Sequence, residues 1–347
     1  MKLAANGFGS MTPVSQPPTD APQLFVVVDT EEEFDWSAPF SREAVGVTAI
    51  AEVGRLQAIL APYRITPTYV VDYPIAATDF SARRLSELAK AGDCHIGAHL
   101  HPWVNPPHLE ALSARTSYAC NLGASLEHDK IERLTEAIGV GIGVVPRAYK
   151  AGRYGFGATT ARIVEQLGFD VDLSVNPHMD FSSDGGPTFE AFEPVPFVFG
   201  HSRRLLELPC TTGFIGTARR FGRPLHRAAS KLETFRGVGV LARSGALNKV
   251  MLSPEGNTFT EMRALTETLY RSDGVRTFAL TLHSPSLKPG CTEYVRTAAD
   301  RDAFLATIDR YCEFFCGTLD GVPTTPAGLY DQYVRPRVNQ GDPTRTP

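Results

Sequence analysis

Short apolar runs, rich in β-branched residues, alternate along the chain with segments whose apolar positions recur at helical spacing. The runs cover Leu24 to Val28 and residues 66–71, 95–100, 147–151, 169–175, 205–208 and 277–282. Each run is bounded by polar or turn-forming residues, which is typical of strands buried on both faces. The pattern therefore predicts about seven strands.

The segments between these runs predict helices over residues 43–61, 81–92, 126–140, 157–167, 257–272 and 300–316. Strands and helices in regular alternation favour a parallel sheet with right-handed crossovers. Polar residues follow nearly every strand, which favours a closed α/β barrel over an open sheet, with the site at the carboxyl ends of the strands. No GxGxxG motif or P-loop follows the first strand, which argues against a nucleotide-binding fold.

One basic segment, residues 215–250, interrupts this rhythm. It contains a single acid, Glu233, and eight basic residues: Arg219, Arg220, Arg223, Arg227, Lys231, Arg236, Arg243 and Lys249. An apolar stripe at helical spacing lies opposite the bases. Two interpretations stay open: an amphipathic helix that contacts anionic lipid or a phosphate-bearing substrate, or an inserted helix packed on the barrel with a solvated basic face.

The composition is that of an ordinary globular protein, with 347 residues, 43% hydrophobic and 21% charged, and a net charge of -4. The six cysteines form no CxxC pair, which indicates a reduced, cytoplasmic protein. The sequence predicts no transmembrane span and no signal peptide. We expect one barrel domain, residues 23–335, between flexible tails at 1–22 and 336–347, and no nucleic-acid partner.

The first predicted strand ends in a cluster of carboxylates. A stretch of seven residues from Asp29 to Asp35 contains five acids. Crowded carboxylates repel one another, so a bound cation would stabilise them. Because alternate residues of a strand share a face, Asp29 and Glu31 can act together, one on a metal ion and the other on protons. The alternative is an exposed acidic loop after a core strand.

Histidines at the end of the third predicted strand complement these acids. His99 and His101 are two residues apart, so their imidazoles share one face, whereas His95 has the same phase but lies deeper. Two histidines and one carboxylate, with positions left for water, suit Zn²⁺, or else Co²⁺, Ni²⁺, Mn²⁺ or Fe²⁺. Such an ion lowers the pKa of bound water to roughly 7. The alternative is that the histidines only pack in a polar rim.

Three further residues could take part in chemistry at this rim. His283 ends the last strand and could act as a general acid toward a leaving group. Lys150 and Arg153 bring two cations, either of which could pair with the base or stabilise a developing oxyanion. Solvation at the surface is the alternative for each cation.

Residues that could shape the site follow the same strands. Asp172 and Glu207 end two of them and could support the site or only the fold. Trp36, Trp103 and Tyr154 stand beside the candidate residues. They could form an apolar or sugar-stacking wall, or belong to the core. We expect all five to contribute to substrate binding.

Six motifs in the order DTEEEFDW, IGAHLHPW, YKAGRYG, DLSV, LELP and TLHSPSL resemble the polysaccharide deacetylase superfamily with the NodB homology domain, a carbohydrate esterase family 4-like group. They look most like its WalW-like branch, which is associated with bacterial surface-polysaccharide gene clusters. The resemblance covers roughly residues 22–330. It implies a distorted (β/α)7 barrel with a divalent metal ion on one carboxylate and two histidines. It also implies hydrolysis of N-acetyl or related acyl groups on sugars by metal-activated water.

By position, the resemblance implies that Asp29 is the catalytic base and Glu31 the metal carboxylate, with Glu32 as its substitute. It further implies that His99 is the first metal histidine and His283 the acid. Lysine or arginine in YKAGRYG would replace the arginine that orients the base. This chain departs from the family pattern of two adjacent aspartates and a His-x3-His pair.

The departures change two expectations. A tryptophan, Trp103, stands four residues after the first metal histidine, so strand phase favours His101 as the second metal ligand, with His95 as the alternative. Lys150 stands where an arginine is expected, and a lysine cannot make the bidentate contact that an arginine makes.

Three functions follow from these observations. The first is a metal-dependent carbohydrate N-deacetylase acting on an amino sugar or glycan precursor, either free or phosphate- or lipid-linked, the linked versions with peripheral membrane contact through 215–250. The second keeps the site but hydrolyses non-sugar amides or cyclic imides. The third is a glycan-binding protein that has lost its metal ion.

Overall fold

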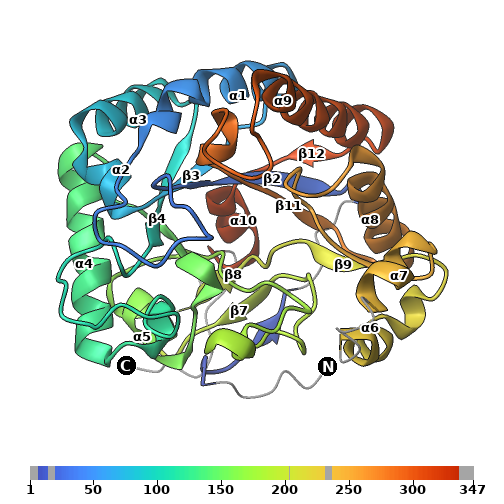
Figure 1. The fold of residues 1–347 in the computed structure, drawn as a ribbon, viewed down its shortest axis with the longest axis horizontal. Coiled ribbons are helices and arrows are strands. Elements are labelled where there is room, and N and C mark those ends of the chain that lie inside the picture. Colours follow the sequence, from blue (N-terminus) through green and yellow to red (C-terminus); the bar gives the residue numbers. More distant parts are fainter. Residues whose placement is uncertain (1–6, 15–19, 203, 231–236, 336–347) are drawn as a thin grey trace.

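The computed structural model describes residues 7–14, 20–202, 204–230 and 237–335 (Figure 1). The main sheet has the strand order β1-β7-β8-β6-β5-β4-β3-β2-β11, and β12 pairs with β2. These strands are β1 (Thr12–Pro13), β2 (Gln23–Thr30), β3 (Thr68–Val71), β4 (His95–Leu100), β5 (Ala148–Ala151), β6 (Val171–Asp172), β7 (Phe197–Phe199), β8 (Leu205–Glu207), β11 (Thr277–His283) and β12 (Val322–Pro323).

Seven of the described strands, from β8 through β6, β5, β4, β3 and β2 to β11, pair in parallel. The predicted distorted seven-stranded α/β barrel is therefore confirmed. Its expected closure is wrong in one respect, because no ladder among the described residues joins β8 to β11. Single hydrogen bonds bridge this gap: Leu252 N donates to Thr211 O, and Thr281 N donates to Leu252 O.

The helices of the described residues surround the curled sheet on its outer side, except for α10 (Pro326–Tyr333), which lies inside the ring of strands (Figure 1). They are α1 (Val53–Leu60), α2 (Tyr73–Ala77), α3 (Asp79–Ala91), α4 (Ala124–Gly141), α5 (Ala158–Gln166), α6 (Gly222–Ser230), α7 (Gly237–Arg243), α8 (Phe259–Ser272), α9 (Ala298–Glu313) and α10 (Pro326–Tyr333). Threonines begin two of them with capping boxes, Thr258 with Glu261 at α8 and Thr297 with Asp300 at α9. None of the helices in the described part of the chain is long and apolar enough to cross a membrane.

The lumen of the barrel is apolar at the amino ends of its strands. There α10 lies across the inside of the ring (Figure 1). One compact cluster contains the inward residues Phe25, Val27, Val70, Ala148, Val171, Leu206 and Ala279, together with Leu329 and Tyr333 of α10. Residues two positions further along the same strands must face the same way. The inward face therefore continues from Val27 to Asp29 and from Ala148 to Lys150.

The amino-terminal segment corrects the expectation of a flexible tail over residues 1–22. β1 pairs antiparallel with β7, and Phe8 is only 3% exposed. Phe8 packs against the rings of Phe156, Phe192 and Phe199. The strand pairing and the burial of this large aromatic side chain together hold the segment on the domain. Residues 1–6 and 15–19, and the tail predicted at 336–347, lie outside the described residues.

The basic segment 215–250 contains two short helices, α6 and α7, that connect the strands of a hairpin. The hairpin pairs β9 (Thr212–Ile215) antiparallel with β10 (Asn248–Met251). Residues 231–236, which include two of the predicted basic positions, lie outside the described part. The predicted helical insertion therefore contains helices, but a strand begins it and another ends it. In the main sheet, the strand predicted over residues 169–175 is shorter and spans only Val171–Asp172.

Candidate functional site

A polar layer lies above the apolar lumen, at the carboxyl ends of the parallel strands. The strand register places His283 beside Asp29 and His99 beside Lys150. All four residues line one cavity of about 990 Å³. The carboxyl ends of parallel strands are where barrel folds place their sites. The strand alternation used on the sequence therefore brings these residues together as expected.

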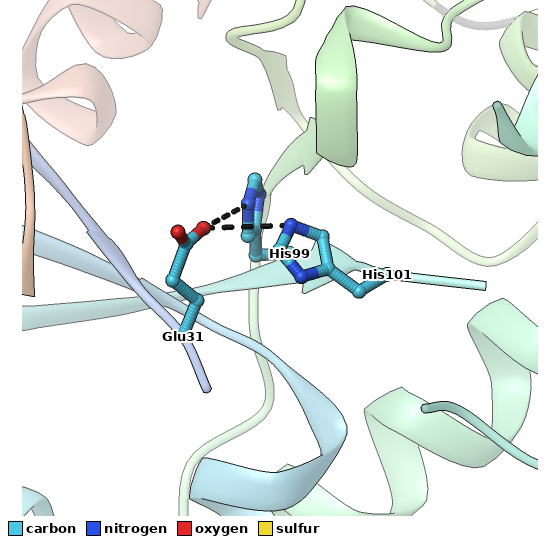
Figure 2. A group of neighbouring side chains, drawn as sticks. All are labelled: Glu31, His99 and His101. Carbon is cyan, nitrogen blue, oxygen red and sulfur yellow. Dashed lines mark hydrogen bonds and ion pairs between the residues drawn. The ribbon is translucent and has the colours of Figure 1, made fainter. Parts of the chain in front are cut away.

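Glu31, His99 and His101 form a compact group at this rim (Figure 2). Glu31 Oε2 lies 3.2 Å from His99 Nε2 and 3.4 Å from His101 Nε2. The three candidate ligand atoms all lie within 4.8 Å of one another, and all three side chains are buried. Two imidazole nitrogens and a carboxylate oxygen are a donor set typical of Zn²⁺ and related divalent ions.

Hydrogen bonds on the far sides of both imidazoles direct the Nε2 atoms toward Glu31. His99 Nδ1 lies 3.0 Å from the backbone oxygen of Lys150, and His101 Nδ1 lies 2.7 Å from Glu32 Oε2. A carbonyl oxygen can only accept, so His99 carries a proton on Nδ1, and Nε2 is the ring atom that can bind a metal ion in place of a proton. Such a partner is typical of metal-binding histidines. The residues present therefore fit a divalent metal ion.

Buried carboxyls that lack a counter-charge beside this group also fit a cation. Burial raises the pKa of Glu32 to about 8, and burial with the neighbouring Glu32 raises that of Asp72 well above its usual value. Glu32 Oε1 has no hydrogen-bond partner among the described residues. The sequence suggested Glu32 as the metal ligand in place of Glu31. Its Oε2 instead contacts Nδ1 of His101, on the side of the ring away from Glu31.

Asp29 is ionised although it is buried. Burial alone raises the pKa of Asp29, but Lys150, His99 and His283 together lower it to about 2. Lys150 Nζ lies 2.7 Å from each Asp29 oxygen. This corrects the expectation that a lysine loses the two-oxygen contact of an arginine, because a single ammonium group spans both oxygens. Asp29 in turn raises the pKa of Lys150, against the effect of burial.

His283 is paired with a carboxylate that the sequence analysis missed. His283 Nδ1 lies 2.6 Å from Glu255 Oε2, and its Nε2 lies 3.6 Å from Asp29 Oδ2. Ser286 donates to the other oxygen of Glu255. Burial alone lowers the pKa of His283, but Glu255, Glu31 and Asp29 raise it to about 10. The sequence holds only a weak signal for it, because Glu255 comes three residues after the short apolar run Val250-Met251-Leu252.

Two predicted residues do not take the places considered for them. Arg153 Nη2 forms a 2.5 Å ion pair with Asp184, and its Nη1 donates to Ser117, so Arg153 does not orient Asp29. Its guanidinium also lies 4.2 Å from the ring centre of Tyr118, so Arg153 stabilises the wall of the cavity. His95 is exposed at the start of β4 and lines a different pocket, so it cannot complete the group at Glu31.

Strand phase explains why Asp172 and Glu207 lie outside the cavity. Their neighbours Val171 and Leu206 face the lumen, so both acids lie on the opposite face of the sheet. Asp172 accepts from Ser174, and Glu207 accepts from the backbone of Val175. The expectation that they bind substrate is therefore wrong: they are fully buried supports of the loop that follows β6.

The aromatic residues divide between the wall and the core. Trp103 is 1% exposed and stacks on His101 with ring centres 4.3 Å apart, so it supports a histidine and does not line the cavity. Trp36 is 54% exposed and does line it. Tyr154 also lines it and stacks on Phe181. Only these two of the three predicted aromatic residues can contact a substrate.

No family model matches the sequence, and no curated protein matches it. Solved structures do share its fold. A Mycobacterium smegmatis protein assigned to the polysaccharide deacetylases matches with a TM-score of 0.59 at 15% identity, over 97% of this chain and 99% of that one. A Pseudomonas aeruginosa PAO1 protein with the same assignment matches with a TM-score of 0.54 at 16% identity, over 93% and 95%.

The allantoinase Puue matches with a TM-score of 0.55 at 15% identity, over 96% of this chain and 97% of that one. These likenesses show that the chain has the distorted (β/α)7 barrel of the polysaccharide deacetylase type. The same fold is that of Puue allantoinase.

Proposed function

We propose that this protein is a metal-dependent hydrolase that removes an N-acetyl or related acyl group from an amino sugar or glycan precursor. One observation carries the proposal: an ionised carboxylate, a protonated histidine and a metal-binding group converge at one rim of the barrel. Asp29, His283 and the Glu31, His99, His101 group provide these three functions. The WalW-like branch and a cytoplasmic location remain predictions from the sequence.

We assign the base and the acid of the reaction to different residues beside the proposed metal group. A bound divalent ion would polarise the acyl carbonyl and supply activated water, with Zn²⁺ the best match to the ligands. Asp29 accepts the proton of the attacking water, and Lys150 holds both carboxylate oxygens in place. His283 donates a proton to the leaving nitrogen as the carbon–nitrogen bond breaks, and Glu255 orients its ring. The products are a carboxylic acid and a free amine.

The charge of the cavity favours an uncharged glycan over a phosphate-bearing one. Its lining contains seven acids (Asp29, Glu31, Glu32, Glu33, Asp35, Glu255 and Glu293) but only three lysines or arginines (Lys150, Arg153 and Arg296). Two of those cations are already paired with acids. None of the described residues of the 215–250 segment lines the cavity. The sequence-based argument for a phosphate- or lipid-linked substrate therefore loses its support.

An apolar wall in the same cavity suits a sugar ring. Phe34, Trp36, Tyr118, Tyr154 and Phe181 all line it, and Trp36 presents an exposed ring at the mouth. Aromatic faces of this kind stack on the apolar face of a sugar. We therefore propose Trp36 and Tyr154 as the substrate-binding residues that remain from the sequence-based set.

A second candidate function is the hydrolysis of non-sugar or cyclic amides at the same site. The fold shared with Puue allantoinase supports it. The same base, acid and metal-binding group would open a cyclic amide as they cleave an open one. The third function, a glycan-binding protein without metal, predicts that the group at Glu31 has no catalytic role.

A substrate panel tests these alternatives. Purified protein loaded with Zn²⁺ or Co²⁺ is given N-acetylated oligosaccharides, N-acetyl sugar phosphates, and cyclic ureides and imides, and the released acid or amine is measured. We expect turnover of the uncharged N-acetyl sugars and its loss in His99→Ala. Turnover of cyclic amides alone would favour the second function, and no turnover of any compound with either metal would contradict both.

A further inference from the structure

Glu32 lies between the proposed metal group and a second buried carboxyl, that of Asp72. Glu32 and Asp72 are 1% and 0% exposed. Asp72 is fixed from two sides, because its Oδ2 accepts from Glu32 N at 2.7 Å and its Oδ1 accepts from Ile75 N at 2.8 Å. The second of these bonds caps α2. Asp72 is thus committed to the backbone, and Glu32 is the carboxyl left to contact His101.

The imidazole of His101 is held on several sides at once. Trp103 stacks on its ring at an interplanar angle of 24°. Gly152 lies against another part of the ring, where a Cβ atom would lie 2.3 Å from Cδ2 and 3.0 Å from Nε2 of His101, and 2.5 Å from the backbone oxygen of Leu100. Glu32 Oε2 lies 2.7 Å from Nδ1. Together these contacts leave the ring one orientation, with Nε2 toward Glu31.

We propose that Glu32 is a positioning residue that fixes His101 as a metal ligand, with Gly152 leaving the space that the ring needs. This inference rests on the proposed metal-dependent function. A metal-bound Nε2 carries no proton, so Nδ1 must carry one and donate it to Glu32. Glu32 itself does not bind the ion, because its contact is on the side of the ring away from Glu31.

This role accounts for the unusual spacing of the two histidines. Residues at i and i+2 of a strand share a face, but His101 follows the last residue of β4, where no ladder fixes its side chain. His99 is fixed by a backbone oxygen of the neighbouring strand. Among the described residues His101 has no such backbone partner for its ring, and Glu32, Trp103 and Gly152 supply the missing constraints.

Metal affinity, measured without substrate, tests the proposal. Zn²⁺ binding is measured by competition with a chromophoric chelator, and Co²⁺ binding by its visible absorption, for wild type, Glu32→Gln, Glu32→Ala and Gly152→Ala. Loss of a carboxylate behind a metal-binding histidine costs about 10–100-fold in affinity. We expect that loss for Glu32→Ala and for Gly152→Ala. A smaller loss is expected for Glu32→Gln, whose amide oxygen still accepts from Nδ1.

Two matched controls separate positioning from general loss of stability. Glu127→Gln alters another fully buried carboxyl, which contacts Thr160. Gly139→Ala adds a methyl group on α4 where nothing lies within 4 Å. Both should keep wild-type affinity for Zn²⁺ and Co²⁺.

The possible outcomes distinguish this inference from the proposed function. Tight binding by wild type with unchanged affinity in Glu32→Ala and Gly152→Ala would overturn the positioning role and leave the metal site standing. Equal losses in the controls would also overturn it. Failure of wild type to bind either ion would overturn the proposed function and this inference together.

Discussion

At the scale of single residues, the ion pair of Asp29 and Lys150 decides whether a buried base can exist at neutral pH. Burial alone raises the pKa of the carboxyl, and the ammonium group 2.7 Å from both oxygens is the main opposing effect. Because the folded-state pKa of about 2 is below the usual 3.8, this pair stabilises the fold above pH 3.8. That contribution is lost as the pH falls through about 2.

The first prediction concerns this pair. Lys150→Met removes the main counter-charge of the buried Asp29, which costs up to about 3–5 kcal/mol of the free energy of unfolding. The double variant with Asp29→Asn should recover most of that loss, while neither variant recovers activity. Urea unfolding and the turnover assay measure the two effects. Wild-type stability in Lys150→Met would contradict the account.

The second prediction concerns the acid. Glu255→Gln removes the negative charge beside His283, so its pKa falls from about 10 and the alkaline limb of the kcat profile moves to lower pH. A charge-assisted hydrogen bond is worth about 1.5–3 kcal/mol, which corresponds to about one to two pH units. The same raised pKa means that the stabilisation by His283 is complete below 6.5 and lost as the pH rises through about 10. An unmoved alkaline limb would show that His283 is not the acid.

The residues of the rim show what strand alternation can and cannot predict. Asp29, Glu31, His99, Lys150 and His283 lie at or just after the carboxyl ends of strands that the apolar pattern indicates, so phase places them together. The short β6 and β8 have too few residues to reveal their phase, so the sequence does not show that Asp172 and Glu207 face away from the cavity. Glu255 follows a hairpin strand outside the parallel pattern, and its approach to His283 depends on tertiary packing.

At the scale of elements, long periodic segments could be predicted and short irregular ones could not. β4 spans the residues expected, and α4, α5, α8 and α9 lie where helical spacing indicates. β1 contains only Thr12 and Pro13, and two residues carry no periodic signal. Its pairing with β7 and the burial of Phe8 both depend on tertiary contacts that composition does not reveal.

The third prediction tests that element. Phe8→Ala should lower the free energy of unfolding by about 3–5 kcal/mol, because the ring is 3% exposed and packs on three other phenylalanines. Phe221→Ala is the matched control, since its ring is 68% exposed and surface changes stay within about 0.5 kcal/mol. Equal effects in urea unfolding would mean that the amino-terminal segment does not contribute to the domain.

At the scale of the whole molecule, the barrel separates an apolar floor from a polar rim. The apolar cluster with α10 fills the lumen at the amino ends of the strands. The polar side chains at the carboxyl ends pack on this cluster and line the cavity. The ring of strands is incomplete between β8 and β11, and hydrogen bonds through Thr211 and Leu252 bridge that gap. The loop after β10 thereby brings Glu255 to His283.

The central claim is that Glu31, His99 and His101 bind a catalytic divalent ion. A crystal structure of protein loaded with Zn²⁺, with anomalous data on both sides of the zinc edge, tests it most directly. We expect one strong anomalous peak in contact with Glu31 and with the Nε2 atoms of His99 and His101, and we expect this peak to be lost in a His99→Ala crystal. A peak at other residues, or none in the wild-type crystal, would contradict the account.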